Sequence, residues 1–246
     1  MLTRHRAAVS FGAVAVSLLA VLPAASSATT VAPPPNTPNL ALMVLQPADL
    51  VPGVAIGAQN YVPPPPGFTA EYGSALRGAT TTDGTRYAVI QDYVALAPST
   101  TVASGFYSDQ QVSLTSPAGR RRLITALLKQ GGKKNPIKRK DIKFGPATSA
   151  NVGSSSFVEA LTVKVKHRTV FEYLLAFQDG DVYVGLALEA VINERIPAAD
   201  PVQLANTIDA HVHTVLGSTG ATGSTGATGS TGASGSTGAS GSTGTT

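Results

Sequence analysis

The chain has 246 residues, with 18 Lys and Arg against 14 Asp and Glu, and no cysteine. Without cysteine it can form no disulfide, thiolate metal site or thiol nucleophile. Its stability must therefore come from buried apolar surface, and residues 39–216 are long enough for one such core. We expect a single domain there.

The first 28 residues are typical of a cleavable secretory signal peptide. Arg4 and Arg6 make its start positive, and residues 7–22 are apolar and uncharged. Small side chains follow, and we expect cleavage after Ala28. The apolar run is shorter than the roughly 20 residues of a membrane-spanning helix. We therefore expect a secreted or cell-envelope protein with no stable transmembrane segment after processing, the alternative being a retained anchor helix.

A linker and two strands are expected next. Residues 29–38 contain several prolines and predict a short, extended linker. Period-two alternation then predicts strands at 68–76 and 86–96, joined by a turn at Asp83-Gly84. One face of the first strand is expected to include Phe68 and Ala70, and one face of the second to carry Tyr87, Val89 and Tyr93.

Two helices are expected in mid-chain. Ser99 or Thr100 can cap the first, and Ser116-Pro117 supplies the cap residue and first-turn proline that favour the second. Gly131-Gly132 ends the second helix. Its apolar residues recur at helical spacing and predict a buried stripe, made of Leu123, Ile124, Leu127 and Leu128.

Three strands with clear alternation follow and predict an antiparallel meander. They run over 157–165, 171–177 and 182–188. Residues 201–216 then predict a closing helix whose apolar residues are spaced to pack on a sheet. The expected fold class is α+β, an antiparallel sheet with this C-terminal meander, packed by two mid-chain helices and a C-terminal helix.

Residues 217–246 form a low-complexity tail in which Gly recurs at every third position. This is the register of collagen, but the other positions hold only Ser, Thr and Ala. The tail thus lacks the proline that favours a triple helix. We expect a disordered spacer rather than a collagen-like segment, and its Ser and Thr residues offer sites for glycosylation.

Positive charge is concentrated in one segment. Ten of the 18 Lys and Arg lie between Arg120 and Lys143, where Asp141 is the one acid. Three arginines fall near the first turn of the second expected helix, where the helix dipole disfavours cations, and a local rule broken in this way often marks function. Backbone N–H groups and guanidinium groups there suit a phosphate, sulfate or carboxylate. The candidate anion-binding residues are Arg120, Arg121, Arg122, Lys133, Lys134, Lys138, Arg139 and Lys140; the alternative is a solvated charged loop.

The sequence contains no recognisable catalytic motif. The Gly-x-Ser-x-Gly pattern of serine hydrolases is missing. His211 and His213, two apart on an expected helix, diverge by about 200° and cannot share a metal. Asp179-Gly-Asp181 is explained by a turn rather than a Ca²⁺ loop, and nothing in the sequence brings Glu189 and Glu194 together as an acid–base pair. We expect no catalytic residue, no metal site and no cofactor.

Three short segments carry a resemblance to a known family. They are Pro47-Ala-Asp-Leu50, Gly180-Asp-Val-Tyr-Val184, and Asp200-Pro-Val-Gln-Leu-Ala205 leading to His211-Val. With the order of elements over residues 40–216, they resemble the small secreted α/β domains of actinobacterial envelopes, of the PsbP-like, LpqN type. The resemblance implies a non-enzymatic binding or sensing domain and supplies no site residues. Lipidated members have a cysteine that this chain lacks, so lipid attachment is not implied.

These observations favour an exported, non-enzymatic binding or sensor-like module. Its partner is expected to be an anionic envelope polymer, a membrane surface or another protein. Nucleic acid is not expected, because the basic segment has no aromatic residue on which bases would stack. The alternatives are a surface-display protein whose tail acts as a stalk, and an enzyme whose site the sequence does not reveal.

Overall fold

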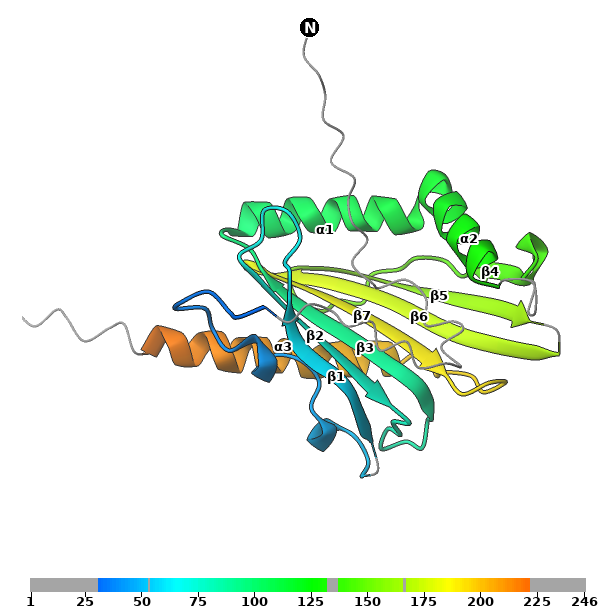
Figure 1. Ribbon diagram of the computed structural model, residues 1–246, viewed down its shortest axis with the longest axis horizontal. Coiled ribbons are helices and arrows are strands. Elements are labelled where there is room, and N and C mark those ends of the chain that lie inside the picture. Colours follow the sequence, from blue (N-terminus) through cyan, green and yellow to red (C-terminus); the bar gives the residue numbers. More distant parts are fainter. Residues whose placement is uncertain (1–30, 53, 132–136, 166, 222–246) are drawn as a thin grey trace, which may run out of the picture.

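The computed structural model describes residues 31–52, 54–131, 137–165 and 167–221 (Figure 1). The expected signal peptide, its cleavage point and most of the low-complexity tail lie outside the described residues. Within them, seven strands form one antiparallel sheet in the order β1-β2-β3-β7-β6-β5-β4. Their bounds are β1 (Ala55–Val62), β2 (Ala70–Arg77), β3 (Tyr87–Leu96), β4 (Ile142–Phe144), β5 (Ser155–Val165), β6 (Arg168–Asp179) and β7 (Val182–Ala190).

The expected α+β class is confirmed, with β5, β6 and β7 forming the predicted meander. None of the described helices is long and apolar enough to cross a membrane. The last helix continues past residue 216, where the tail was expected to begin. The helices are α1 (Thr100–Thr115), α2 (Pro117–Gly131) and α3 (Asp200–Ala221), with short 3-10 turns η1 (Leu40–Leu42), η2 (Pro47–Asp49) and η3 (Arg139–Asp141).

α1 and α2 meet at a tight corner, where two serines cap the helices and one position has no room for a side chain. The Ser99 hydroxyl accepts a hydrogen bond from the Val102 N–H at the start of α1. The Ser116 hydroxyl accepts one from the Gly119 N–H at the start of α2, so both predicted caps are confirmed. A Cβ atom at position 119 would lie 1.7 Å from the Ser113 carbonyl oxygen, so this corner requires glycine.

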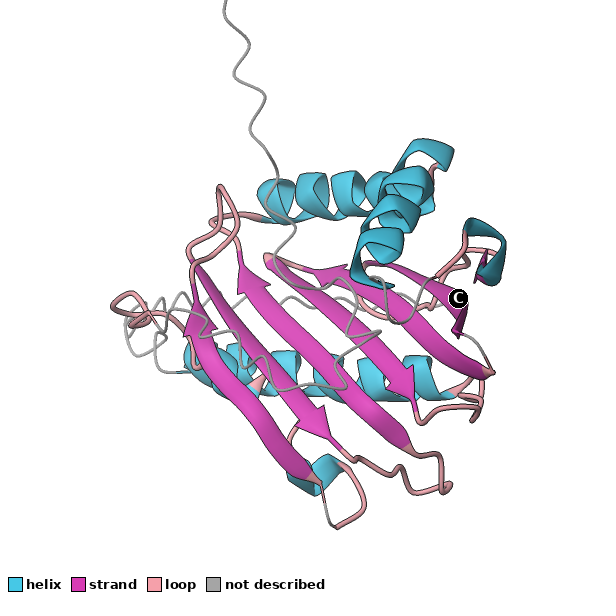
Figure 2. Cartoon of the chain, turned by 45° about the vertical axis from the view of Figure 1, so that its right-hand side comes forward, coloured by secondary structure: helices cyan, strands magenta, loops and turns pink. Residues whose placement is uncertain are grey.

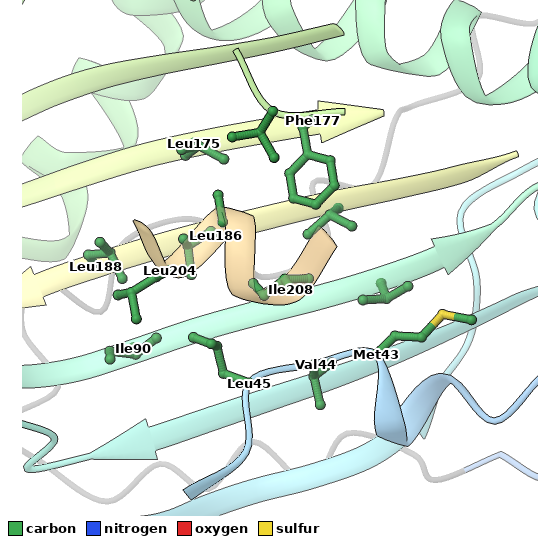
Figure 3. Close-up of a cluster of buried hydrophobic side chains, with 14 of the residues drawn as sticks. Met43, Val44, Leu45, Ile90, Leu175, Phe177, Leu186, Leu188, Leu204 and Ile208 are labelled. Carbon is green, nitrogen blue, oxygen red and sulfur yellow. The ribbon is translucent and has the colours of Figure 1, made fainter. Parts of the chain in front are cut away.

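α3 covers one face of the sheet and closes the larger apolar core (Figure 3). Its apolar stripe packs on alternate side chains of β6 and β7, as the two periodicities predict. The N-terminal segment around η1 covers the rest of this core, with Leu40, Met43 and Leu45 fully buried. The Leu45 N–H donates a hydrogen bond to the buried Asp92 carboxylate at 2.6 Å, which joins this segment to β3.

α1 and α2 lie on the opposite face, along one side of it, and leave the rest of that face without a helix (Figure 2). α1 packs against Phe157 and Tyr183. α2 contributes Leu127 to a separate cluster near β4 and β5. Leu128, expected in the same buried stripe, is 37% exposed, because α2 sits at the margin of the sheet and buries only a narrow face.

Two expectations about strand faces were wrong. A bulge between Tyr87 and Val89 shifts the alternation of β3 by one residue. Tyr87 therefore lies on the α3 face, where its hydroxyl donates to the buried carboxylate of Asp200 at 2.6 Å. Phe68 precedes β2 and packs on the Phe106 ring of α1, with centroids 4.9 Å apart, rather than beside Ala70.

Tyr93 on the third strand has a glycine opposite it on each neighbouring strand, and its ring lies over one of the two. Tyr93 on β3 pairs with Gly73 on β2 and with Gly185 on β7. A Cβ atom at position 185 would lie 2.2 Å from the Tyr93 ring, whereas one at position 73 would meet no atom within 4 Å. The ring cannot swing away freely, because it also contacts Tyr183, hydroxyl to hydroxyl at 3.3 Å.

We expect Gly185→Ala to lower the free energy of unfolding by about 1–3 kcal/mol, the usual cost of forcing a group into filled space. The matched control is Gly73→Ala, which should be neutral or raise stability by up to about 1 kcal/mol, because alanine restricts the unfolded chain. Urea unfolding followed by circular dichroism measures both. Equal effects of the two substitutions would contradict the described position of the Tyr93 ring.

Candidate functional site: a basic surface and buried carboxylates

Five of the eight candidate anion-binding residues are exposed on α2 and η3. Arg121 and Arg122 project from α2, and Lys138, Arg139 and Lys140 lie at or in η3. Lys133 and Lys134 lie outside the described residues. The chain segments that carry the five side chains are held together by an apolar cluster beneath them, made of Leu127, Ile137, Ile142, Leu161, Val163, Val165 and Val170.

Two further cations belong to this surface. Lys129 lies on the same stripe of α2 as Arg121 and Arg122, and the stripe lines a shallow hollow with small side chains between the charges. Arg168 pairs with Val165 in the β5–β6 register, so both side chains point to the α2 face. We define the basic surface as Arg121, Arg122, Lys129, Lys138, Arg139, Lys140 and Arg168, all exposed. Sequence reasoning missed Arg168, because only the strand register places it on the sheet face that α2 covers.

The basic surface is not neutralised by acids of the described chain. The described ion pairs join Arg86 to Glu194, Arg120 to Glu159, and two histidines to nearby aspartates. In the part of the chain that the structure describes, none of the seven basic side chains has a carboxylate oxygen within 4 Å of its nitrogens. These cations are therefore free to meet an external anion.

The expectation that Arg120 belongs to the anion-binding site was wrong, because an acid of the sheet binds this arginine. Its guanidinium turns inward and pairs with Glu159 of β5, whose side chain is 1% exposed. It also donates to the Gly145 carbonyl oxygen at 3.3 Å and lies over the Phe144 ring, 5.4 Å from its centroid. A carboxylate buried this far needs a charged partner. The ion pair with Glu159 thus explains why an arginine occurs in the first turn of α2, where the helix dipole disfavours a cation.

The two histidines of α3 diverge, as helical spacing predicts. The Nδ1 atom of His211 lies 3.2 Å from the Val44 carbonyl oxygen, and its Nε2 atom lies 3.5 Å from an Asp49 oxygen. His213 points instead toward Asp179 and Asp209. The two imidazoles therefore have separate partners and do not share a site.

A pair of carboxylates, one buried and one partly buried, lies on the sheet face that carries α1 and α2. Glu172 on β6 pairs with Glu189 on β7, and both line a cavity of about 10 Å³ with Val89, Gln91 and Ala187. Glu172 is 3% exposed, and each glutamate has one buried oxygen without a hydrogen-bond partner. The space holds about one water molecule and no substrate. Glu194, the other residue weighed as a partner for Glu189, binds Arg86 instead.

The environment of this pair favours the protonated carboxyl groups. Burial, and then the neighbouring charge of Glu189, raise the pKa of Glu172 to about 8. Burial raises the pKa of Glu189 to about 7, against the lowering effect of Arg77. The two side chains therefore hold protons near neutral pH that the unfolded chain would release.

The chain resembles a solved protein in structure, while the sequence comparisons find no match. No protein-family model matches it, and no curated protein matches its sequence. The solved extracellular domain of PknH from Mycobacterium tuberculosis is similar to it in structure, with a TM-score of 0.46 and 12% sequence identity. That likeness covers 76% of this chain and 99% of the other. A likeness of this degree assigns neither a family nor a function, so the PsbP-like family stays a prediction.

The carboxylate pair makes the stability of the fold depend on pH. Between about pH 4.5 and 8 the unfolded chain has released protons that folded Glu172 still holds, so the free energy of unfolding falls as the pH rises. We expect Glu172→Gln to flatten this fall, since glutamine resembles the protonated acid, and to be more stable than the unchanged protein at pH 8.5. Urea unfolding at pH 5.5, 7 and 8.5 measures the slope.

Glu194→Gln is the control for this measurement, because Glu194 is ion-paired at the surface and the substitution should leave the slope above pH 5.5 unchanged. If Glu172→Gln and the unchanged protein lost stability in parallel up to pH 8.5, protonation of the buried pair would be ruled out as the cause.

Proposed function

We propose that this protein is an exported, non-enzymatic binding module whose basic surface binds an anionic polymer of the cell envelope. The observation that carries the proposal is that seven exposed cations belong to α2, η3 and the start of β6, the segments that surround one apolar cluster. Their backbones are held by a shared apolar cluster, so the charges are presented on a fixed scaffold.

The chemistry of the surface favours phosphate, sulfate or carboxylate groups. Four of the seven cations are arginines, whose planar guanidinium groups bind such anions through two parallel hydrogen bonds. The shallow hollow along α2 is lined by Ala118, Thr125 and Ala126 between the basic side chains. A chain carrying repeated anions would lie there and contact several cations at once, so that weak contacts add up.

Other polyanions fit this surface less well. The described residues that line the hollow between the α2 cations include no aromatic side chain on which bases could stack, which disfavours single-stranded nucleic acid. Phe144, the aromatic residue next in sequence to the basic segment, lies beneath Arg120. A peripheral membrane contact would use apolar side chains at the same face, and α2 offers one, the partly exposed Leu128. The polymer is therefore the partner that we favour, and the membrane is an outcome of the test.

We expect Arg121→Gln with Arg139→Gln to weaken binding to dextran sulfate and to reduce its salt dependence. Each lost contact should lower the slope of log affinity against log salt by about 1, because fewer counterions are released. The control is Arg77→Gln with Arg195→Gln, which removes two exposed arginines elsewhere and should leave the slope unchanged. Binding is measured at NaCl concentrations on both sides of the physiological value.

Vesicles of phosphatidylglycerol and phosphatidylcholine form the second arm of this experiment. Binding to vesicles but not to dextran sulfate would replace the polymer with a membrane surface. Equal loss of dextran sulfate binding in the control double variant would mean that net charge, and not this surface, governs binding, and the proposal would fail.

Export is tested separately. When the full chain is expressed in a secreting bacterial host, we expect protein in the medium or envelope that begins at Thr29, as cleavage after Ala28 requires. Intact mass and N-terminal sequencing determine the start. Full-length protein that retains Met1 and stays in the cell interior would contradict export and the envelope partner.

A further inference from the structure

Three potential metal ligands meet at the end of the sheet where β6 finishes. Asp179 is the last residue of β6, while Asp209 and His213 lie one turn apart on α3. The Nε2 atom of His213 is 3.4 Å from an oxygen of Asp179 and 3.7 Å from an oxygen of Asp209. One donor atom of each side chain lies within 4.8 Å of the other two. The three donors thus form a compact triangle.

The size of this triangle matches the coordination shell of a small divalent cation. Zn²⁺ binds imidazole nitrogen and carboxylate oxygen at about 2.0–2.2 Å. Two ligands of a tetrahedral ion at that distance lie about 3.3–3.6 Å apart. The separations from His213 to the two carboxylates are therefore close to bonding values, and small side-chain rotations would complete the set.

The elements that carry the donors are fixed in place. α3 is held on the sheet by Leu204, Ile208 and Val212, which are buried in the large core with side chains of β6 and β7. The Ser154 hydroxyl donates to one oxygen of Asp179 at 2.8 Å, which leaves the other oxygen directed to His213. Hydrogen bonds of this kind orient the ligands in metal sites.

Charge balance also favours a cation at this place. One oxygen of Asp209 is buried and has no hydrogen-bond partner among the described residues. Within that part of the chain, no Lys or Arg pairs with either aspartate. When His213 is uncharged, the two carboxylates face each other with no cation to balance them, and a divalent ion would cancel both charges.

We propose that Asp179, Asp209 and His213 bind one Zn²⁺ ion. The imidazole ligand distinguishes the set from the all-oxygen shells that Ca²⁺ and Mg²⁺ require. His213 is 64% exposed, so the coordination positions not filled by protein face solvent and are completed by water. The competing explanation is a plain ion-pair cluster, in which protonated His213 alone balances the aspartates.

The experiment uses the full chain without a histidine tag, stripped with EDTA and titrated with ZnCl₂ at pH 7.5 by calorimetry. We expect saturable binding of one ion per chain. Asp209→Asn and His213→Gln should each weaken that binding at least tenfold, because each removes one of three ligands. The matched control is His211→Gln, which removes the neighbouring imidazole that points to Val44 and should leave the affinity unchanged.

Circular dichroism confirms that each variant is folded, and Asp179→Asn replaces any variant that is not. Co²⁺ supplies a second readout, because its visible absorption becomes intense in a tetrahedral site; the unchanged protein should show this band and His213→Gln should not. The proposal is overturned if the unchanged protein shows no saturable Zn²⁺ binding, or if Asp209→Asn and His213→Gln bind Zn²⁺ as tightly as it does.

Discussion

The pair of Arg120 with Glu159 is the interaction on which the arrangement of α2 depends. Glu159 lies within β5 with its side chain 1% exposed, and a charge there must be matched by a cation. Arg120 supplies it from the first turn of α2 and, together with the buried Leu127 seven residues later, fixes which side of the helix faces the sheet. Leu127 then points into the apolar cluster, while Arg121 and Arg122 point to solvent. The ion pair of Arg120 with the buried Glu159 thus helps to orient α2 so that Arg121 and Arg122 are exposed.

The larger apolar core lies on one face of the sheet, and three glutamates that are buried or partly buried lie on the other. The α3 face is closed by one large apolar core, together with the N-terminal segment around η1. Two buried acids on this face each accept a hydrogen bond, Asp92 from the Leu45 N–H and Asp200 from the Tyr87 hydroxyl, and burial still raises the pKa of Asp92 to about 7. The opposite face holds Glu159, Glu172 and Glu189, groups whose burial opposes their ionisation. The apolar core of the first face stabilises the fold enough to tolerate these groups on the second.

The elements that were predicted correctly follow from local periodicity in the sequence. The features that were missed depend on which strands pair and in which register. The meander, the helix caps and the α3 stripe each follow from residues a few positions apart. Tyr87 was misplaced because a bulge leaves no clear trace in alternation. Arg168 joins the basic surface, and Glu159 captures Arg120, only through the strand register. The sequence shows that Asp209 and His213 are four residues apart on one helix. It does not show that Asp179 lies beside them, because that contact arises only when α3 packs on β6.

The two charged sites lie at opposite ends of one strand, which bears on whether they interact. β6 begins at Arg168 in the basic surface and ends at Asp179 beside His213. Twelve residues of strand at about 3.3 Å per residue separate them by roughly 36 Å. Charges are screened over about 8 Å at physiological ionic strength, so a cation bound at Asp179 would neither attract a polyanion at the basic surface nor repel the Arg168 guanidinium. The two sites are therefore expected to act independently.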